Sequence, residues 1–202
     1  KRIYGFQIGD YKATSLKIYP THSTFSINDS EEVFKLNYNG RHNIENALAA
    51  ISVGLTMGIA LDKMVSALEK FRGIKRRFEV IFQNEKCVYI DDYAHHPTEI
   101  RSLLKSLRNM YPGQKITGIF QPHLFSRTKD FVDGFAESLS QFDEILLLEI
   151  YPARELPIPG ITSELLLSKI PMEKKSVVSK EDFIQRMQAD KPRLLVTMGA
   201  GD

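Results

Sequence analysis

The chain has 202 residues, of which 43% are hydrophobic and 26% charged, and its formal net charge is +2 at pH 7. This composition suits one large or two modest globular domains, and the lack of a Lys/Arg block argues against nucleic acid as the main partner. The single cysteine, Cys87, excludes an internal disulfide and a multi-cysteine metal site, which fits a cytoplasmic protein. No signal peptide or uninterrupted apolar span is present, so we expect no membrane association.

The first part of the chain predicts a small α+β region. Residues 1–38 alternate short apolar and polar runs, which indicates a small antiparallel sheet. From Gly40 the apolar spacing becomes helical, and a second helix follows and ends at Gly73. The stretch 73–79 is basic and has no clear period, so we place a domain boundary there, after residue 79.

From residue 80, five short apolar strands alternate with four helices of ordinary length. This pattern predicts an α/β fold with right-handed βαβ crossovers and a mostly parallel sheet covered by helices on both faces. The expected strands are Cys87–Ile90, Ile116–Phe120, Ile145–Glu149, Ser176–Val178 and Leu194–Thr197. The expected helices are Pro97–Met110, residues 128–139, residues 163–170 and Glu181–Met187.

Polar loops follow four of these strands. In a parallel sheet the loops share one edge, where ligands bind in open α/β folds. Among their residues, His123 and Arg127 suit a carboxylate or phosphate, because guanidinium and imidazole both donate hydrogen bonds to anions. The alternative is that Arg127 only caps a surface helix and His123 is an ordinary loop histidine.

The loop after the first of these strands holds two carboxylates and two imidazoles: Asp91, Asp92, His95 and His96. These residues form either part of a ligand site or a hydrogen-bonded loop network. A zinc site built from His95, His96 and His123 is a further alternative, although adjacent histidines point in different directions and the usual ligand spacing is missing.

Two asparagines lie near the start of the first predicted helix. Asn43 and Asn46 are three residues apart and share one helix face, so their amides could bind a purine edge, and the alternative is simple N-capping. The chain has no G-x-x-x-x-G-K-[ST] motif and cannot itself cradle a triphosphate in the usual way. The Gly199–Gly201 segment follows a strand, but a lone Gly-x-Gly is a weak signal.

Six motifs, in order, closely resemble the Mur ligase family. They are Gly40–Ala50, Arg76–Glu79, Asp91–Glu99, Gln121–Thr128, Tyr151–Glu155 and Thr197–Asp202. The last three resemble the members that join L-alanine to UDP-N-acetylmuramate. The resemblance implies a ligase of peptidoglycan precursor synthesis in which ATP, with Mg²⁺, activates a carboxylate as an acyl phosphate that an amino group then attacks.

The resemblance also implies a domain organisation. Residues 1–79 would be the last, partial α+β segment of a central ATP-binding domain, and residues 80–202 most of a Rossmann-like C-terminal domain. The P-loop, most magnesium ligands and the UDP-binding domain would precede this chain, so we expect the chain alone to be inactive. An incomplete central domain exposes a sheet edge, and self-association is expected there.

The resemblance assigns roles to six residues and none to a catalytic group within the chain. The nucleotide-binding residues would be Asn43, Asn46, Arg77 and Asp92, and the residues that hold the amino acid's carboxylate would be His123 and Arg127. Many relatives have arginine where this chain has Leu124, so here Arg127 would carry more of that contact.

Two other interpretations stay open. The chain could belong to the recycling ligase that attaches an intact tripeptide to the same sugar nucleotide, although His123 and Arg127 suit a single small carboxylate. It could also be a nucleotide-binding module that has lost catalysis.

Overall fold

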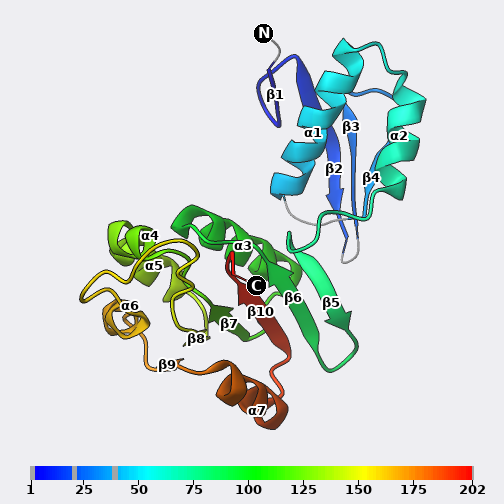
Figure 1. Cartoon of the computed structure of the whole chain (residues 1–202). Coiled ribbons are helices and arrows are strands. Elements are labelled where there is room, and N and C mark those ends of the chain that lie inside the picture. The colour runs from blue at the N-terminus through cyan, green and yellow to red at the C-terminus, as the bar shows by residue number, and fades with distance from the viewer. Residues whose placement is uncertain (1–2, 20–21, 38–40, 202) are drawn as a thin grey trace. The chain divides into compact units, whose positions relative to one another are not determined.

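A computed structural model describes residues 3–19, 22–37 and 41–201 (Figure 1). The chain divides into two compact units, Lys1–Ile74 and Lys75–Asp202, so the division falls within the basic stretch 73–79 but before residue 79, where the sequence analysis placed the boundary. Residues just after the boundary belong to the second unit because Phe78 is buried in its core and Glu79 pairs with Asp91. No helix in the described ranges is both long and apolar enough to cross a membrane.

The first unit is a four-stranded sheet with two helices. Its strands, in spatial order, are β1 (Tyr4–Gly5), β2 (Tyr11–Ile18), β3 (Ser23–Ile27) and β4 (Phe34–Leu36), and its helices are α1 (Arg41–Thr56) and α2 (Leu61–Lys70). The antiparallel prediction is confirmed for β2, β3 and β4 and wrong for β1, which runs parallel to β2.

The core of the first unit forms where the helical spacing predicted it. Ile44, Leu48 and Ile51 of α1 are at most 2% exposed and pack with Phe25 and Phe34 of the sheet. The predicted helix start at Gly40 lies outside the described residues. This unit is therefore a small α/β layer pair whose apolar faces meet.

The second unit contains the predicted parallel sheet, with six strands in the order β5-β6-β10-β7-β8-β9. The strands from β6 to β10 are all parallel to their neighbours, and β5 is antiparallel to β6. Their bounds are β5 (Glu79–Gln83), β6 (Val88–Asp92), β7 (Ile116–Phe120), β8 (Glu144–Leu147), β9 (Lys175–Val177) and β10 (Leu194–Met198).

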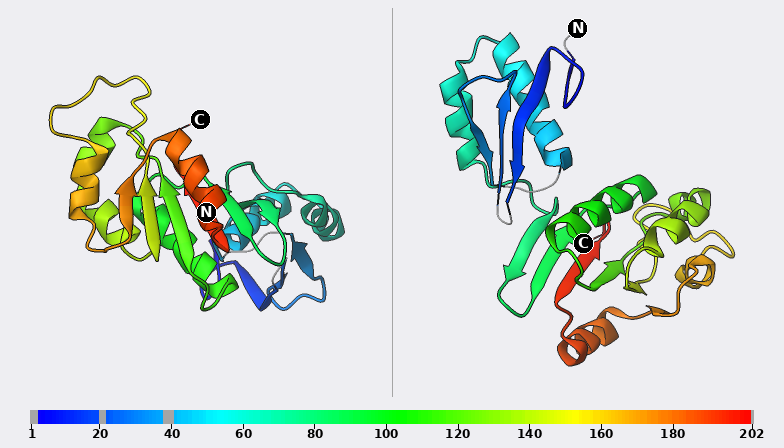
Figure 2. Two further views of the ribbon diagram at one scale, coloured as in Figure 1. Left: turned by 90° about the horizontal axis from the view of Figure 1, so that it is seen from below. Right: turned by 180° about the vertical axis from the view of Figure 1, so that it is seen from behind.

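Helices cover both faces of this sheet (Figure 2). Side chains of α3, α5 and α6 join the main core with alternate residues of β6, β7, β8 and β10, whereas α7 lies on the other face, where its Arg186 binds Glu144. The helices are α3 (Pro97–Met110), α4 (Phe125–Asp130), α5 (Val132–Leu139), α6 (Ser163–Lys169) and α7 (Lys180–Asp190).

Three local features differ from the sequence prediction. Strand β5 was missed because Val80, Ile81 and Phe82 are consecutive apolar residues without alternation, and the pairing with β6 shifts register between Val80 and Phe82. The helix predicted over 128–139 is two helices broken at Phe131, whose φ of −117° is not helical. Strand β6 continues through Asp92, two residues beyond its predicted end.

Candidate functional site

The carboxyl ends of three neighbouring strands lie level with one another. Met198, the last residue of β10, pairs with Asp92 of β6 on one side and Phe120 of β7 on the other. The loops that follow these three strands therefore start from one edge of the sheet. This is the edge at which open α/β folds bind ligands.

Asp91 and Asp92 lie on opposite faces of the sheet. Because β6 runs through both residues, their side chains alternate, and Asp92 is 7% exposed while Asp91 is more accessible. The sequence prediction grouped them on one loop because it ended the strand at Ile90. They belong to two different hydrogen-bond networks.

Asp92 connects the start of the second unit to the loop after β6. Its carboxylate accepts backbone N–H bonds from Phe78 at 2.7 Å and from Ala94 at 2.8 Å. Burial raises the pKa of Asp92 above its ordinary 3.8, and these two bonds and Arg77 work against that rise. Asp92 therefore has a structural role on its own, and its predicted contact with ribose stays a prediction.

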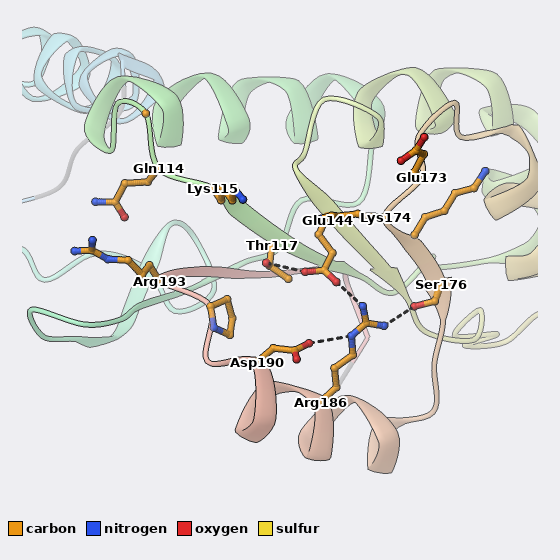
Figure 3. A pocket seen from close by; sticks show the side chains of 13 residues that line it. Gln114, Lys115, Thr117, Glu144, Glu173, Lys174, Ser176, Arg186, Asp190 and Arg193 are labelled. Carbon is orange, nitrogen blue, oxygen red and sulfur yellow. Dashed lines mark hydrogen bonds and ion pairs between the residues drawn. The ribbon is translucent and has the colours of Figure 1, made fainter.

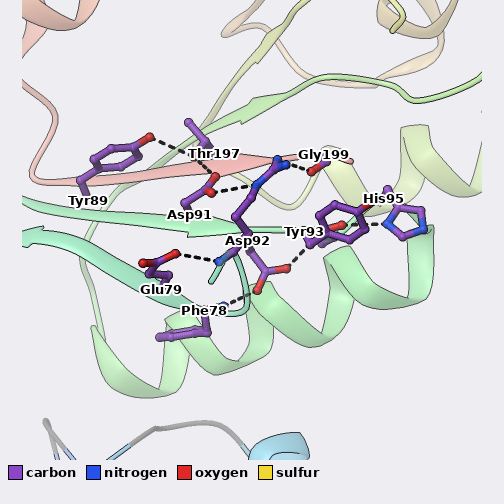
Figure 4. Close-up of polar contacts among 11 residues, drawn as sticks. Phe78, Glu79, Tyr89, Asp91, Asp92, Tyr93, His95, Thr197 and Gly199 are labelled. Carbon is purple, nitrogen blue, oxygen red and sulfur yellow. Dashed lines mark hydrogen bonds and ion pairs between the residues drawn. The ribbon is translucent and has the colours of Figure 1, made fainter. Parts of the chain in front are cut away.

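Asp91 is the centre of a second network on the other face (Figure 4). It accepts a hydrogen bond from the Thr197 hydroxyl at 2.5 Å and from Arg76 Nε at 3.2 Å. A second Arg76 nitrogen, Nη2, donates to the carbonyl oxygen of Gly199 at 2.7 Å. Arg76 thus joins the ends of β6 and β10, a role that the sequence analysis, which singled out Arg77, did not assign.

A row of aromatic rings and cations connects the loops along this edge. The guanidinium groups of Arg76 and Arg77 lie 5.2 and 5.3 Å from the Tyr93 ring centre. Tyr93 contacts His95 edge to face at 5.1 Å, and His95 contacts His123 at 6.4 Å. The predicted residues Arg77 and His123 are therefore connected through the rings of Tyr93 and His95.

His123 and Arg127 are brought together as the sequence predicted. Arg127 lies on α4, and its Nη1 donates to His123 Nδ1 at 3.3 Å. The neutral ring then carries its proton on Nε2. Burial, Arg127 and His95 lower the pKa of His123 below its ordinary 6.5, so the ring is held neutral near pH 7.

The backbone of Leu124, which lies between His123 and Arg127 in the chain, is strained. Leu124 precedes α4 with φ 73° and ψ 134°, a conformation that side chains rarely adopt. Its N–H donates to the carbonyl oxygen of Tyr151 at 3.0 Å, and its own carbonyl accepts from the Thr128 amide and hydroxyl. Such strain persists only where neighbouring contacts impose it, and it is common at binding sites.

The glycines after β10, Gly199 and Gly201, lie against Gln121 and leave no space for a side chain. A Cβ on Gly199, whose φ is +142°, would lie 2.7 Å from the carbonyl oxygen of Gln121, and one on Gly201 would meet the same residue's side-chain oxygen. The Gln121 N–H donates to the carbonyl oxygen of Met198 at 3.0 Å. This segment is therefore held tightly against the loop after β7.

His95 and His96 diverge, as adjacent residues do. His95 Nδ1 donates to the Tyr93 carbonyl at 2.8 Å, while His96 caps α3 and lies against Phe131. Within residues 3–19, 22–37 and 41–201, no three His, Cys, Asp or Glu side chains are arranged to hold a metal ion. The geometry gives no support to the zinc alternative.

Asn43 and Asn46 lie in the first turns of α1 in the first unit. Asn46 is exposed and Asn43 is half-buried, and their spacing places them on one side of the helix. Arg41 of the same turn lies over the Phe6 ring at 4.1 Å. Their contact with adenine stays a prediction.

A cleft of about 730 Å³ lies at the opposite, amino-terminal edge of the sheet (Figure 3). Its polar groups bind one another: Arg186 bonds Glu144 at 2.5 Å, Asp190 at 3.2 Å and Ser176 at 3.0 Å, and Glu144 also accepts from Thr117. Because its central charges are mutually satisfied, this cleft is a weaker ligand candidate than the carboxyl edge.

Together these features define a parallel α/β domain whose carboxyl edge brings a neutral imidazole and a guanidinium side by side. The model of the "Mur ligase, glutamate ligase domain" matches residues 76–201, and the chain belongs to the Mur ligase family.

The relatives that it resembles are longer. A UDP-N-acetylmuramate–L-alanine ligase from Flavobacterium johnsoniae is 48% identical over 195 residues, which are 95% of this chain and 43% of the relative. The crystal structure of the UDP-N-acetylmuramate-alanine ligase of Thermotoga maritima matches with a TM-score of 0.79 at 28% identity, over 98% of this chain and 44% of its own. A murein peptide ligase from Psychrobacter arcticus matches with a TM-score of 0.62 at 26% identity, over 98% and 43%. The chain thus spans less than half the length of these proteins.

Proposed function

We propose that the chain is part of a cytoplasmic, ATP-dependent ligase that joins L-alanine to the carboxylate of UDP-N-acetylmuramate in peptidoglycan precursor synthesis. The Flavobacterium and Thermotoga relatives support this assignment by their names and their coverage of almost the whole chain. The observation that carries it is the Arg127–His123 pair, 3.3 Å apart at the carboxyl edge of the sheet.

This pair would hold the carboxylate of the incoming amino acid. Arg127 supplies a permanent positive charge, and His123, with Nδ1 occupied by Arg127, offers its Nε2–H as a second donor. Fixing the carboxylate leaves the amino group free to attack at a defined position, which lowers the entropic part of the barrier.

The proposed reaction proceeds through one activated carboxylate, an acyl phosphate. ATP transfers its γ-phosphoryl group to the carboxylate of UDP-N-acetylmuramate and leaves as ADP. The uncharged amino group of L-alanine then attacks the acyl carbon, and the C–O bond to phosphate breaks, which releases inorganic phosphate and a proton. This chain would orient the nucleophile and contact the nucleotide.

Four residues of this chain are proposed to contact ATP, each for its own chemical reason. Asn43 and Asn46 have the amide chemistry to bind an adenine edge, and exposed Arg77 has the charge to bind phosphate oxygens. Asp92 fits ribose less well because both its oxygens already accept backbone bonds. No carboxylate cluster among the described residues suits Mg²⁺, so no residue of this chain is assigned to that ion.

Each unit would be one piece of a larger domain. We propose that residues 1–79, apart from the few that join the second unit, complete the ATP-binding domain of the ligase, and that the rest forms most of its C-terminal domain. Self-association of the isolated chain remains a prediction, which sedimentation velocity over a range of concentrations would check.

Phosphate release by the full-length ligase tests the proposal. With ATP, Mg²⁺ and UDP-N-acetylmuramate, we expect release with L-alanine and much less with glycine, L-serine or the recycled tripeptide. Release driven only by the tripeptide would favour the recycling ligase. The similarity to the Psychrobacter murein peptide ligase supports this second candidate. No release with any acceptor would favour a binding module.

A further inference from the structure

The loops that follow β7 and β8 are joined at several points beside the Arg127–His123 pair. Tyr151 N–H donates to the carbonyl oxygen of Pro122 at 2.8 Å, and Leu124 N–H donates to the carbonyl oxygen of Tyr151 at 3.0 Å. The ring of Tyr151 stacks on His123, with centres 5.6 Å apart and planes within 14°. The two loops therefore act as one ligand-facing unit.

Glu155 makes the last of these connections, at the start of α4. Its carboxylate accepts the Ser126 amide at 2.9 Å and the Ser126 hydroxyl at 2.5 Å. The first turn of a helix has unpaired N–H groups, and Leu124 at the N-cap has no side-chain acceptor to satisfy them. Glu155, 29 residues away in the chain, supplies the acceptor that the local sequence lacks.

This carboxylate lies where a negative charge would repel an anionic ligand. Both of its oxygens accept hydrogen bonds from Ser126, however, and these two bonds lower the pKa of Glu155, so it is ionised near pH 7. Its charge also favours protonation of His123, against the effect of Arg127. A negative charge beside an anion site is unfavourable for binding, so the two bonds that Glu155 makes to Ser126 are the best explanation for its position.

We propose that Glu155 is a positioning residue, which fixes the first turn of α4 through Ser126 so that Arg127 and His123 present their donors to one small carboxylate. Arg127 is the next residue after Ser126, so the backbone that Glu155 fixes is the backbone that carries the guanidinium. The effect on acceptor binding rests on the proposed function, whereas the positioning of α4 does not.

Kinetics of the full-length ligase test the effect on the acceptor. In Glu155→Gln, only one side-chain oxygen can accept, so we expect the KM for L-alanine to rise roughly tenfold while the KM for ATP stays within about twofold. Ser126→Ala removes only the hydroxyl bond and should raise the KM for L-alanine roughly threefold. Ser126→Thr keeps a hydroxyl group and should have the KM of the wild type.

Glu164→Gln is the matched control, since Glu164 is an exposed carboxylate in the first turn of α6. Its kinetic constants should equal those of the wild type. Equal rises in the KM for ATP and for L-alanine in Glu155→Gln, or no rise in either, would overturn the proposal. If Glu155→Gln loses folding in general, its thermal midpoint will fall. The KM for L-alanine in Ser126→Ala then tests the proposal in its place, and an unchanged value would overturn it.

NMR of the 202-residue chain tests the positioning without any turnover. In Glu155→Gln we expect faster hydrogen exchange at the Ser126 amide and a lower pKa of His123, because the charge that favours its protonation is gone. Unchanged exchange and an unchanged His123 titration would contradict the positioning role. If the wild-type ligase accepts no amino acid but both NMR changes occur, the proposed function fails and the positioning role stands.

Discussion

The two edges of the parallel sheet in the second unit both carry charged groups and use them differently. At the amino edge, Arg186 is surrounded by Glu144, Asp190 and Ser176, which together satisfy its guanidinium. At the carboxyl edge, the guanidinium of Arg127 binds a neutral imidazole and has no carboxylate partner among the described residues, and nearby Leu124 is held in a strained conformation. A charge cluster whose members bind one another leaves no group for a ligand, whereas a guanidinium without a carboxylate partner beside strained backbone can bind an anion.

Removing the buried carboxylate at the carboxyl edge should have the largest effect on stability. Asp92→Ala leaves the N–H groups of Phe78 and Ala94 buried without an acceptor, so we expect the free energy of unfolding to fall by about 3 kcal/mol. Urea titration followed by NMR signals of the second unit would measure it. Asp190→Ala at the amino edge is the control and should cost at most about 0.5 kcal/mol, because that ion pair is exposed. Equal losses would mean that the two edges are equally built for stability.

The glycine after β10 should be the next most sensitive position. Gly199→Ala places a Cβ 2.7 Å from the Gln121 carbonyl oxygen at a φ of +142°, so we expect a loss of about 2 kcal/mol in the free energy of unfolding. Gly113→Ala, at the amino-edge cleft, also has a positive φ of +73° but meets nothing within 4 Å, and should cost about 1 kcal/mol. A larger loss at Gly113 than at Gly199 would contradict the close approach.

The smallest expected effect is on the titration of His123. NMR should show its pKa below 6.5, since burial and Arg127 disfavour the protonated ring. Arg127→Ala removes that cation and should raise the pKa, whereas Arg186→Ala should leave it unchanged. A lower pKa of His123 in Arg127→Ala would show that the two side chains do not interact as described.

The sequence predicted the regular parts of the second unit well, because their periods are strong. Helix α3 and strand β7 have the predicted bounds, and the four loops after the parallel strands were identified correctly. The proximity of His123 and Arg127 was predictable because both residue types and their four-residue spacing are visible locally, whereas their binding of a carboxylate stays a prediction. The strand order, with β10 between β6 and β7, had no local signal.

The errors concern contacts between distant residues and the ends of elements. Ending β6 two residues early placed Asp91 and Asp92 in one cluster, although they lie on opposite faces of the sheet. The contact of Glu155 with Ser126 joins residues from two different loops, and no local pattern reports it. The role of Arg76 also depends on the end of β10, far along the chain.

The most direct test of the central claim compares one arginine from each edge in the full-length ligase. In Arg127→Ala we expect the KM for L-alanine to rise by at least about tenfold, since the charged hydrogen bonds to its carboxylate are lost, while Arg186→Ala changes it by less than about twofold. An unchanged KM in Arg127→Ala, or an equal rise in Arg186→Ala, would contradict an acceptor site at the carboxyl edge.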